Sequence, residues 1–307
     1  MSNTNVADLD SLLNQVNEIK EQKIKDENKG FAIDPRILSF KKGAKYTLRF
    51  VPDLKKPTNN FVSYKEIVFP SQLDGTTVYA GRSPSDAGIN AKDDLFNKTQ
   101  WADYNKAKEA GNEPARKLAC KLIPQRKQLA NVYLHAVEGD KDAEAKIGQN
   151  LVIRYSAQLD KDKKPSSDLL KKIDSALFGD KQKKIGSRAL DLTEKGKSFT
   201  IVVGTKDLGG GTKIPEYVDS EFEDAESLGL TKERIAEILA GVHDLNEFIP
   251  EVKTKEEAQQ ILDEHWFCKS ATVDDNLSAE ETPDADDDDI PGLTEESSDV
   301  DDLLKDL

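Results

Sequence analysis

The stretch "KYTLRFV", Lys45–Val51, decides the fold that the sequence predicts. Its side chains alternate between apolar and polar, which is the two-residue repeat of a β-strand with one buried face. Pro52 follows and ends the strand, because proline has no amide hydrogen to donate to a sheet. The side chains expected to face the core are those of Tyr46, Leu48 and Phe50. A protein built around a β-sheet is therefore the first expectation.

Four further runs have the same strand character: "NFVSYKEIVF", "LANVYLHAV", "LVIRYSA" and "SFTIVVG". Gly, Pro and Asp separate the runs, and five short strands of this kind predict a small barrel. Polar segments that favour helices lie between them, at Asp93–Ala110 and Ser166–Phe178. The predicted fold class is mainly β with helical additions (α+β).

Both ends of the chain differ from this β body. Residues 7–24, "ADLDSLLNQVNEIKEQKI", repeat apolar side chains every three to five positions, which predicts an amphipathic helix. Residues 221–269 favour helices again, with Thr231 and Thr254 as caps. Residues 270–307 are too polar to form a core and are predicted to be disordered. The predicted divisions are 1–30 (helix and linker), 31–220 (β core), 221–269 (helical region packed on the core) and 270–307 (acidic tail).

The composition favours a soluble protein of a reducing compartment. No run of about 18 apolar residues is present, and the first residues lack the basic-then-apolar pattern of a signal peptide. The two cysteines, Cys120 and Cys268, stand far apart, which argues against a disulfide framework. We therefore expect an unexported, cytoplasmic protein.

The net charge of −14 is unevenly distributed. Residues 31–220 carry 34 basic and 24 acidic side chains, whereas residues 221–307 carry 6 basic and 28 acidic ones. A basic body attracts polyanions, and an acidic end can fold back over a cationic surface. The simpler alternative is that the acidic end only keeps the protein soluble.

Metal and catalytic chemistry find little support in the sequence. The possible zinc ligands are Cys120, Cys268, His135, His243 and His265. No two of them are spaced closely enough in sequence to form a typical zinc-binding pair. No structural zinc and no nucleophile–base arrangement is predicted. Carboxylate pairs such as Asp93-Asp94 and Glu256-Glu257 leave a metal-dependent nuclease open as an alternative, although solvated helix ends explain them as well.

Basic and aromatic residues are interleaved along the body, and unpaired nucleic acid needs both types. Cations neutralise phosphates, and an aromatic ring stacks on an unstacked base whatever its identity. The predicted phosphate partners are Arg49, Arg82, Arg126, Lys127, Arg154, Lys183 and Lys184. The predicted stacking platforms are Trp101, Tyr104 and Tyr133, each of which could equally be a core side chain.

The strand repeat sorts some of these residues between the two faces of a sheet. Arg49 lies opposite the apolar face of its strand and is expected to point outward. Tyr133 lies opposite the small apolar face of "LANVYLHAV", which makes it a stacking candidate. Arg154 likewise lies opposite Tyr155, which is in phase with the apolar residues of its run.

The end of the chain, "DVDDLLKDL", resembles the end of the single-stranded DNA-binding (helix-destabilising) protein of T-even-type, T4-like bacteriophages. The resemblance continues in the same order along most of the chain, in the segments "NKGF", "RFVP", "DLFN", "ANVYL" and "SEFEDA". It implies an OB-fold core that binds single strands cooperatively in phage DNA replication, recombination and repair. It also implies contacts with the phage DNA polymerase, helicase loader, primase-helicase and recombination proteins, in the infected bacterial cell.

Two features depart from this family. The family holds a zinc ion through one His and three Cys, but the matching segment here, "VYAGRSPSDAGINAKDDLFN", contains neither residue type. The family also begins with a basic cluster used for filament cooperativity, whereas "MSNTNVADLD" has no positive side chain. We therefore expect no cofactor and no metal.

The last residues, 300–307, combine carboxylates with an apolar helical face. The aspartates are expected to compete with DNA for the basic groove, in a salt-sensitive way. The apolar face is expected to dock into a partner. The predicted partner-binding residues are Val300, Asp301, Asp302, Leu303, Leu304, Asp306 and Leu307. The sequence thus predicts a non-enzymatic, sequence-independent single-stranded DNA-binding protein, with a metal-dependent nuclease or an acidic chaperone for basic proteins as alternatives.

Overall fold

The computed structural model describes residues 34–90, 92–160, 162–179, 185–207, 213–225 and 227–269. The chain divides into two units, Met1–Leu38 and Ser39–Leu307. In the first unit the described residues include strand β1 (Ile37–Leu38) and an ion pair of 2.8 Å between Arg36 and Asp34. The predicted helix at 7–24 and the predicted tail at 270–307 lie outside the described residues.

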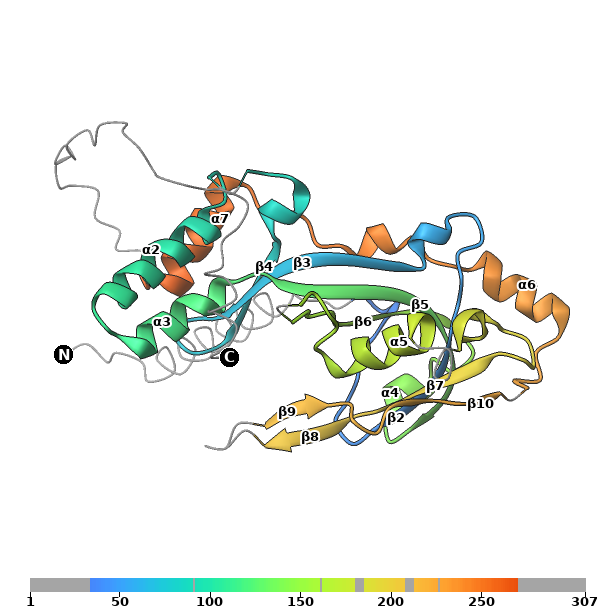
Figure 1. Cartoon of the computed structure of the whole chain (residues 1–307). Coiled ribbons are helices and arrows are strands. Elements are labelled where there is room, and N and C mark those ends of the chain that lie inside the picture. The colour runs from blue at the N-terminus through green and yellow to red at the C-terminus, as the bar shows by residue number, and fades with distance from the viewer. Residues whose placement is uncertain are drawn as a thin grey trace, which may run out of the picture. The chain divides into compact units, whose positions relative to one another are not determined.

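The second unit contains an antiparallel sheet in which the strands pair in the order β6-β5-β2-β7-β10, while β3 pairs with both β5 and β4 (Figure 1). A separate hairpin joins β8 to β9. The strands are β2 (Lys45–Phe50), β3 (Phe61–Pro70), β4 (Thr77–Arg82), β5 (Gln125–Glu138), β6 (Asn150–Ser156), β7 (Lys197–Val202), β8 (Gly204–Asp207), β9 (Lys213–Glu216) and β10 (Glu221–Ala225). All five predicted strands are present.

Among the described residues the sheet does not close on itself, because β6 and β10 do not pair with each other. The structure is therefore mixed α+β with a mostly β core, as predicted, but the predicted barrel is not closed by hydrogen bonds in the part described. Two local predictions are wrong. Strand β4 has no counterpart among the predicted strands, and Glu221–Ala225, expected to be helical, pairs with β7 as β10.

The core lies where the opening stretch predicts it. Tyr46, Leu48 and Phe50 of β2 are fully buried. The ring of Phe50 packs 5.9 Å from that of Phe199 and 5.6 Å from that of Phe61, measured between centroids. Burying one such side chain contributes about 1.5–3 kcal/mol, so the apolar face of β2 is a main source of stability.

Strand β5 is the longest strand and links two parts of the sheet. Its first half, from Gln125 to Ala130, pairs with β3, and its second half, from Val132 to Glu138, pairs with β2. Residues Leu129–Leu134 are buried on both faces. Because successive side chains of a strand point to opposite faces, other elements must cover both sides of the sheet here.

Helices near the β3–β4 hairpin form one group (Figure 1). They are α2 (Leu95–Glu109), α3 (Glu113–Ala119), α7 (Lys255–Ile261) and the π-helix η6 (Leu262–Trp266). Phe69 of the hairpin, Phe96 of α2 and Trp266 of η6 meet in one buried cluster. Asp94 caps α2 by accepting a hydrogen bond from the backbone of Asn97, and Thr254 and Glu257 form a capping box on α7.

The remaining helices include η3 (Cys120–Leu122), whose Leu122 belongs to the same buried cluster. They are α4 (Lys141–Glu144), α5 (Asp168–Phe178), α6 (Lys232–Ala240) and the 3-10 turns η1 (Pro57–Asn59), η2 (Pro84–Ala87), η3 (Cys120–Leu122), η4 (Gly186–Leu190) and η5 (Leu245–Phe248). Both helices predicted within the body, α2 and α5, are present. Among the described helices, none is long and apolar enough to cross a membrane.

Candidate nucleic-acid interface

Strand pairing brings cations from three strands to one face of the sheet. In β3, Tyr64 stands opposite Lys127 of β5, and Glu66 stands opposite Arg82 of β4. Directly opposed side chains share a face, so these residues lie on the same side of the sheet. Arg154 of β6 joins them through an ion pair with Glu66. We call this set, Arg82, Lys127 and Arg154 around Tyr64 and Glu66, the cationic face.

Glu66 is the centre of the cationic face. Its side chain is 4% exposed, and its two carboxylate oxygens lie 3.6 Å from Nζ of Lys127 and 3.5 Å from Nη1 of Arg154. The hydroxyl of Tyr64 donates a third contact, a hydrogen bond of 3.1 Å to Oε2. One carboxylate is therefore shared by two cations at rather long distances, which leaves positive charge at this face.

The protonation states of this cluster follow from its environment. Burial raises the pKa of Tyr64 far above its ordinary value, and the negative charge of Glu66 raises it further, so the hydroxyl remains a donor. Burial by itself would lower the pKa of Arg154, but Tyr64 and Glu66 outweigh it and raise the pKa. Arg154 therefore keeps its charge at any physiological pH.

The edge of the cationic face is open to solvent. Arg82 pairs with Asp86 at 2.8 Å, and both side chains are partly exposed. Tyr79 of β4 stands opposite Val68, which shares its side of β3 with Tyr64 and Glu66, and Tyr79 is 39% exposed. An exposed aromatic ring next to half-buried cations is the combination that single strands require.

Arg126 lies on the other side of the same strands. It stands opposite Lys65 of β3, and both side chains are at least partly exposed. Neighbouring residues of a strand alternate in direction, so Arg126 and Lys127 cannot line the same face. The pair that is adjacent in sequence is thus divided between two surfaces.

The prediction that Arg49 points outward is wrong. Its side chain is completely buried, and Nη1 donates to the backbone carbonyls of Asp191 and Thr193 at 3.0 and 2.6 Å. Nε donates to the hydroxyl of Ser198 at 3.2 Å. The turn before β7 encloses the guanidinium, which therefore acts inside the fold and cannot reach a phosphate.

Two of the three predicted stacking platforms are core side chains. Tyr133 is 7% exposed and packs with Val51, Leu192 and Ile238, because α6 covers the face on which it lies. Tyr104 is 5% exposed and packs against the partly buried Trp101, with ring centroids 5.9 Å apart. Neither tyrosine presents a free ring, whereas Trp101 keeps partial exposure.

Sequence reasoning missed Glu66, Tyr64 and Tyr79. Tyr64 and Glu66 lie inside the predicted strand "NFVSYKEIVF" at alternating positions, so the strand repeat places them on one face. Nothing local shows that a buried carboxylate would collect cations there. Tyr79 belongs to "TVYAGR", whose β-branched and aromatic residues are a weak strand signal.

Other predicted residues lie outside the described part of the chain, so their placement is not part of this interface. They are Lys183 and Lys184 and the partner-binding set Val300, Asp301, Asp302, Leu303, Leu304, Asp306 and Leu307.

The zinc ion that the resemblance implies does not fit the residues present. Zinc sites use cysteine, histidine or carboxylate ligands, and Val78–Asn97 has neither cysteine nor histidine. Val78, Ala80 and Phe96 of this segment instead enter the buried cluster with Trp266. Within the described ranges, no group of three or more His, Cys, Asp or Glu side chains is placed to hold a metal ion.

A scan of the chain against protein-family models finds no match, and a search of curated proteins finds none with significant similarity.

Proposed function

We propose that this protein binds single-stranded DNA without sequence preference, through the cationic face and the exposed ring of Tyr79 beside it. The observation that carries the proposal is the meeting of Lys127 and Arg154, from two different strands, at the single carboxylate of Glu66, with Arg82 on the neighbouring strand opposite Glu66. A phosphate group can accept hydrogen bonds from Lys127 and Arg154, because one carboxylate at long distance does not satisfy all their N–H donors. Such charge-assisted hydrogen bonds to phosphate are strong.

The proposal includes no catalytic step. A protein that binds unpaired strands better than duplex shifts the melting equilibrium by mass action, without consuming a nucleotide. This is the activity of a helix-destabilising protein in replication, recombination and repair. It agrees with the basic character of residues 31–220.

The proposal also includes membership of the T4-like phage family and an OB-fold core in residues 31–220. The antiparallel path β6-β5-β2-β7-β10, in which the long strand β5 pairs with β3, β6 and β2, is compatible with such a core, and the pairing is open among the described residues. In this proposal the zinc ion of the family is replaced by the apolar cluster around Phe69 and Trp266.

The acidic end completes the proposal on sequence grounds alone. Its aspartates compete with DNA for the cations, and its apolar residues recruit the polymerase, helicase loader, primase-helicase and recombination proteins of the phage. Deleting Asp284–Leu307 should tighten DNA binding at low salt and abolish partner recruitment. If neither property changes, the role of the tail is wrong while DNA binding by the body stands.

The decisive experiment is a fluorescence-anisotropy titration of labelled oligo(dT) and of a duplex of equal length, over a series of salt concentrations. We expect much tighter binding of oligo(dT), with log K falling by about 0.7 per neutralised phosphate for each unit of log[salt]. A preference for duplex, or the absence of binding in dilute buffer, would overturn the proposal.

A further inference from the structure

Beside the start of β3 the surface forms a groove from two adjoining hollows of about 360 and 460 Å³. Thr58 and Phe61 line both hollows, so the two adjoin at these residues. Lys56, Asn59 and Asn246 line the first hollow, and Phe178 lines the second. The groove thus has a polar end and an aromatic end.

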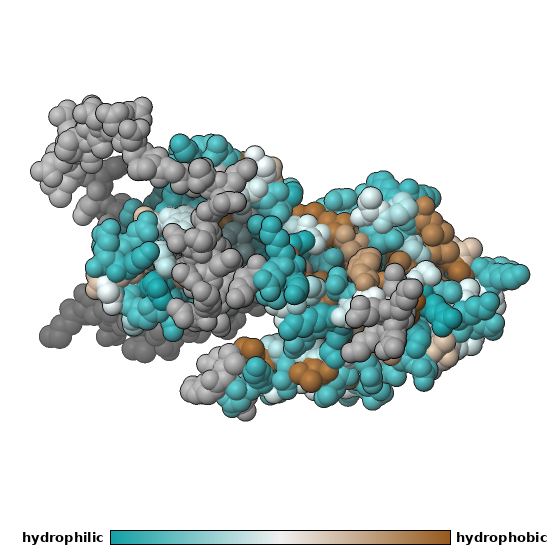
Figure 2. Space-filling model, viewed as in Figure 1, coloured by the Kyte–Doolittle hydropathy of each residue, from teal (hydrophilic) through white to brown (hydrophobic). Residues whose placement is uncertain are grey.

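The aromatic end carries an unusually exposed ring. Phe178, the last residue of α5, is 71% exposed. Phe61 next to it is held in place by its packing on Phe50, at 5.6 Å between centroids. Figure 2 shows hydrophobic surface in this area, between the positions of β3 and α5. An exposed ring beside a fixed one offers a flat base a surface on which to stack.

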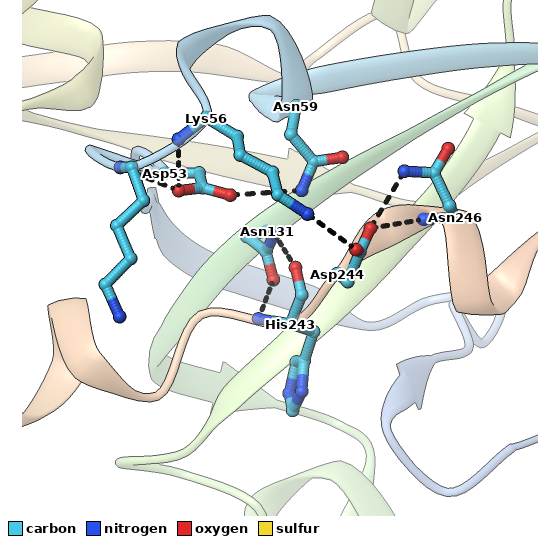
Figure 3. Close-up of polar contacts among 8 residues, drawn as sticks. Asp53, Lys56, Asn59, Asn131, His243, Asp244 and Asn246 are labelled. Atoms are coloured by element: carbon cyan, nitrogen blue, oxygen red, sulfur yellow. Dashed lines mark hydrogen bonds and ion pairs between the residues drawn. The ribbon is translucent and has the colours of Figure 1, made fainter.

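The polar end contains a buried acceptor that lacks a hydrogen bond. Asn59 is 4% exposed, and its Nδ2 donates to Asp53 at 3.2 Å, but its Oδ1 has no partner. In Figure 3 this oxygen points away from Asp53, on the side where Asn246 lies. Nearby, Lys56 reaches Asp244 at 3.2 Å. Buried polar atoms are almost always hydrogen-bonded, so this acceptor beside the hollow is open to a donor from a ligand.

Only the first hollow lies on the side of β3 that carries the cationic face. Val62 lines the first hollow and, by strand alternation, lies on the same side of β3 as Tyr64 and Glu66. Five residues separate Phe61 from Glu66, or about 17 Å of extended strand. By the same alternation Phe61 lies on the other side of β3 from Glu66, so a single polynucleotide reaches both places by crossing the start of β3, where Thr58 and Phe61 line both hollows.

We propose that this groove holds unstacked bases of the single strand whose phosphates contact the cationic face. Phe178 stacks on a base, the Oδ1 of Asn59 accepts a hydrogen bond from a base N–H, and Lys56 exchanges Asp244 for a phosphate. Every base has a flat ring and at least one N–H donor, so the groove accepts any sequence. This inference rests on the proposed function and adds the place where the bases lie.

The test compares Phe178→Ala with Phe267→Ala, a matched control in which an exposed phenylalanine next to η6 is removed. Each variant is titrated with oligo(dT) by anisotropy, and its thermal unfolding is recorded. Loss of one stacking contact should weaken binding of the Phe178 variant about 10-fold, without changing the salt dependence, because the ring carries no charge. Phe267→Ala should bind like the unmodified protein.

Photocrosslinking gives a second readout that does not depend on affinity. Oligonucleotides containing 5-iododeoxyuridine should form adducts at Phe178 or Phe61. If Phe178→Ala binds normally while Lys127→Ala binds weakly, or if all adducts lie elsewhere, the groove inference is wrong and the proposed function stands. If the unmodified protein fails to bind oligo(dT), the proposed function itself is wrong.

Discussion

Two arginines on strands that flank β5 have opposite fates. Arg49 of β2 is enclosed by the turn before β7 and donates to the carbonyls of Asp191 and Thr193. Arg154 of β6 stays half exposed and shares Glu66 with Lys127. Both arginines lie opposite the apolar face of their strands. The comparison teaches that strand alternation identifies a face but not the segment that covers it.

The largest effect is expected for Arg49→Met, which tests whether Arg49 stabilises the fold. This change removes three hydrogen bonds that the guanidinium donates, to the part-buried carbonyls of Asp191 and Thr193 and to the hydroxyl of Ser198. At about 0.5–1.5 kcal/mol for each, the free energy of unfolding should fall by about 1.5–4.5 kcal/mol. Urea unfolding followed by circular dichroism measures the loss. Lys232→Ala, at an exposed position of α6, is the control and should unfold like the unmodified protein. Unchanged stability with weaker DNA binding would mean that Arg49 reaches DNA after all.

A second buried charged group, Asp140, predicts that the fold is sensitive to acid. Burial by itself would raise the pKa of Asp140, but hydrogen bonds from Lys41, Tyr46 and the backbone of Ala143 outweigh it and lower the pKa below its ordinary 3.8. Burial and this contact also raise the pKa of Tyr46 to about 12, so its hydroxyl donates throughout. A carboxyl group with a lowered pKa stabilises the fold above its ordinary pKa and loses this effect as the pH falls through the folded value.

The matching variant is Asp140→Asn. It should lower the free energy of unfolding by about 1–2 kcal/mol at pH 7, because hydrogen bonds to a charged acceptor are stronger than those to an amide. The difference between the two proteins should shrink as the pH falls below 3.8. Urea unfolding at a series of pH values measures this, and a difference independent of pH would contradict the role of the charge.

Substitutions in the cationic face should be distinguished from Arg49→Met by their effect on DNA binding. Lys127→Ala and Arg154→Ala each leave the buried Glu66 with one cation, so the free energy of unfolding should fall by about 1–3 kcal/mol. Each should make the plot of log K against log[salt] shallower by about 0.7, the effect of one phosphate contact. Arg126→Ala, on the other side of the sheet, shows whether that surface also contacts DNA. An unaltered slope in both Lys127 and Arg154 variants would remove the cationic face from the interface.

The smallest expected effect on DNA binding is that of removing the charge of Glu66. Glu66→Gln keeps the hydrogen bond from Tyr64 but removes the charge that competes with phosphate for Lys127 and Arg154. Binding of oligo(dT) should tighten roughly 3-fold, equivalent to about 0.7 kcal/mol. Glu223→Gln, at a partly exposed position of β10, serves as the control for a loss of one negative charge. Weaker binding by the Glu66 variant would show that its carboxylate organises the cations instead of competing with DNA.

The sequence predicted the strands and their faces well, because alternation is a local property. It placed Tyr46, Leu48 and Phe50 in the core, and it placed Arg154 opposite the buried Tyr155. It could not predict the cover on Arg49 or Tyr133, because the covering segments lie about 100 or more residues away in the chain. Glu66 was missed for the same reason: its cations come from strands far along the sequence. Local patterns therefore identify faces, and only the assembled sheet shows which faces remain open.

The length of β5 has a practical consequence. One continuous strand, Gln125–Glu138, supplies a backbone partner to β3 and β6 at its beginning and to β2 further on. No cut in the chain can therefore yield the proposed binding surface and the β2 core as two independently folding fragments. Limited proteolysis or recombinant dissection should yield either the whole second unit or insoluble pieces.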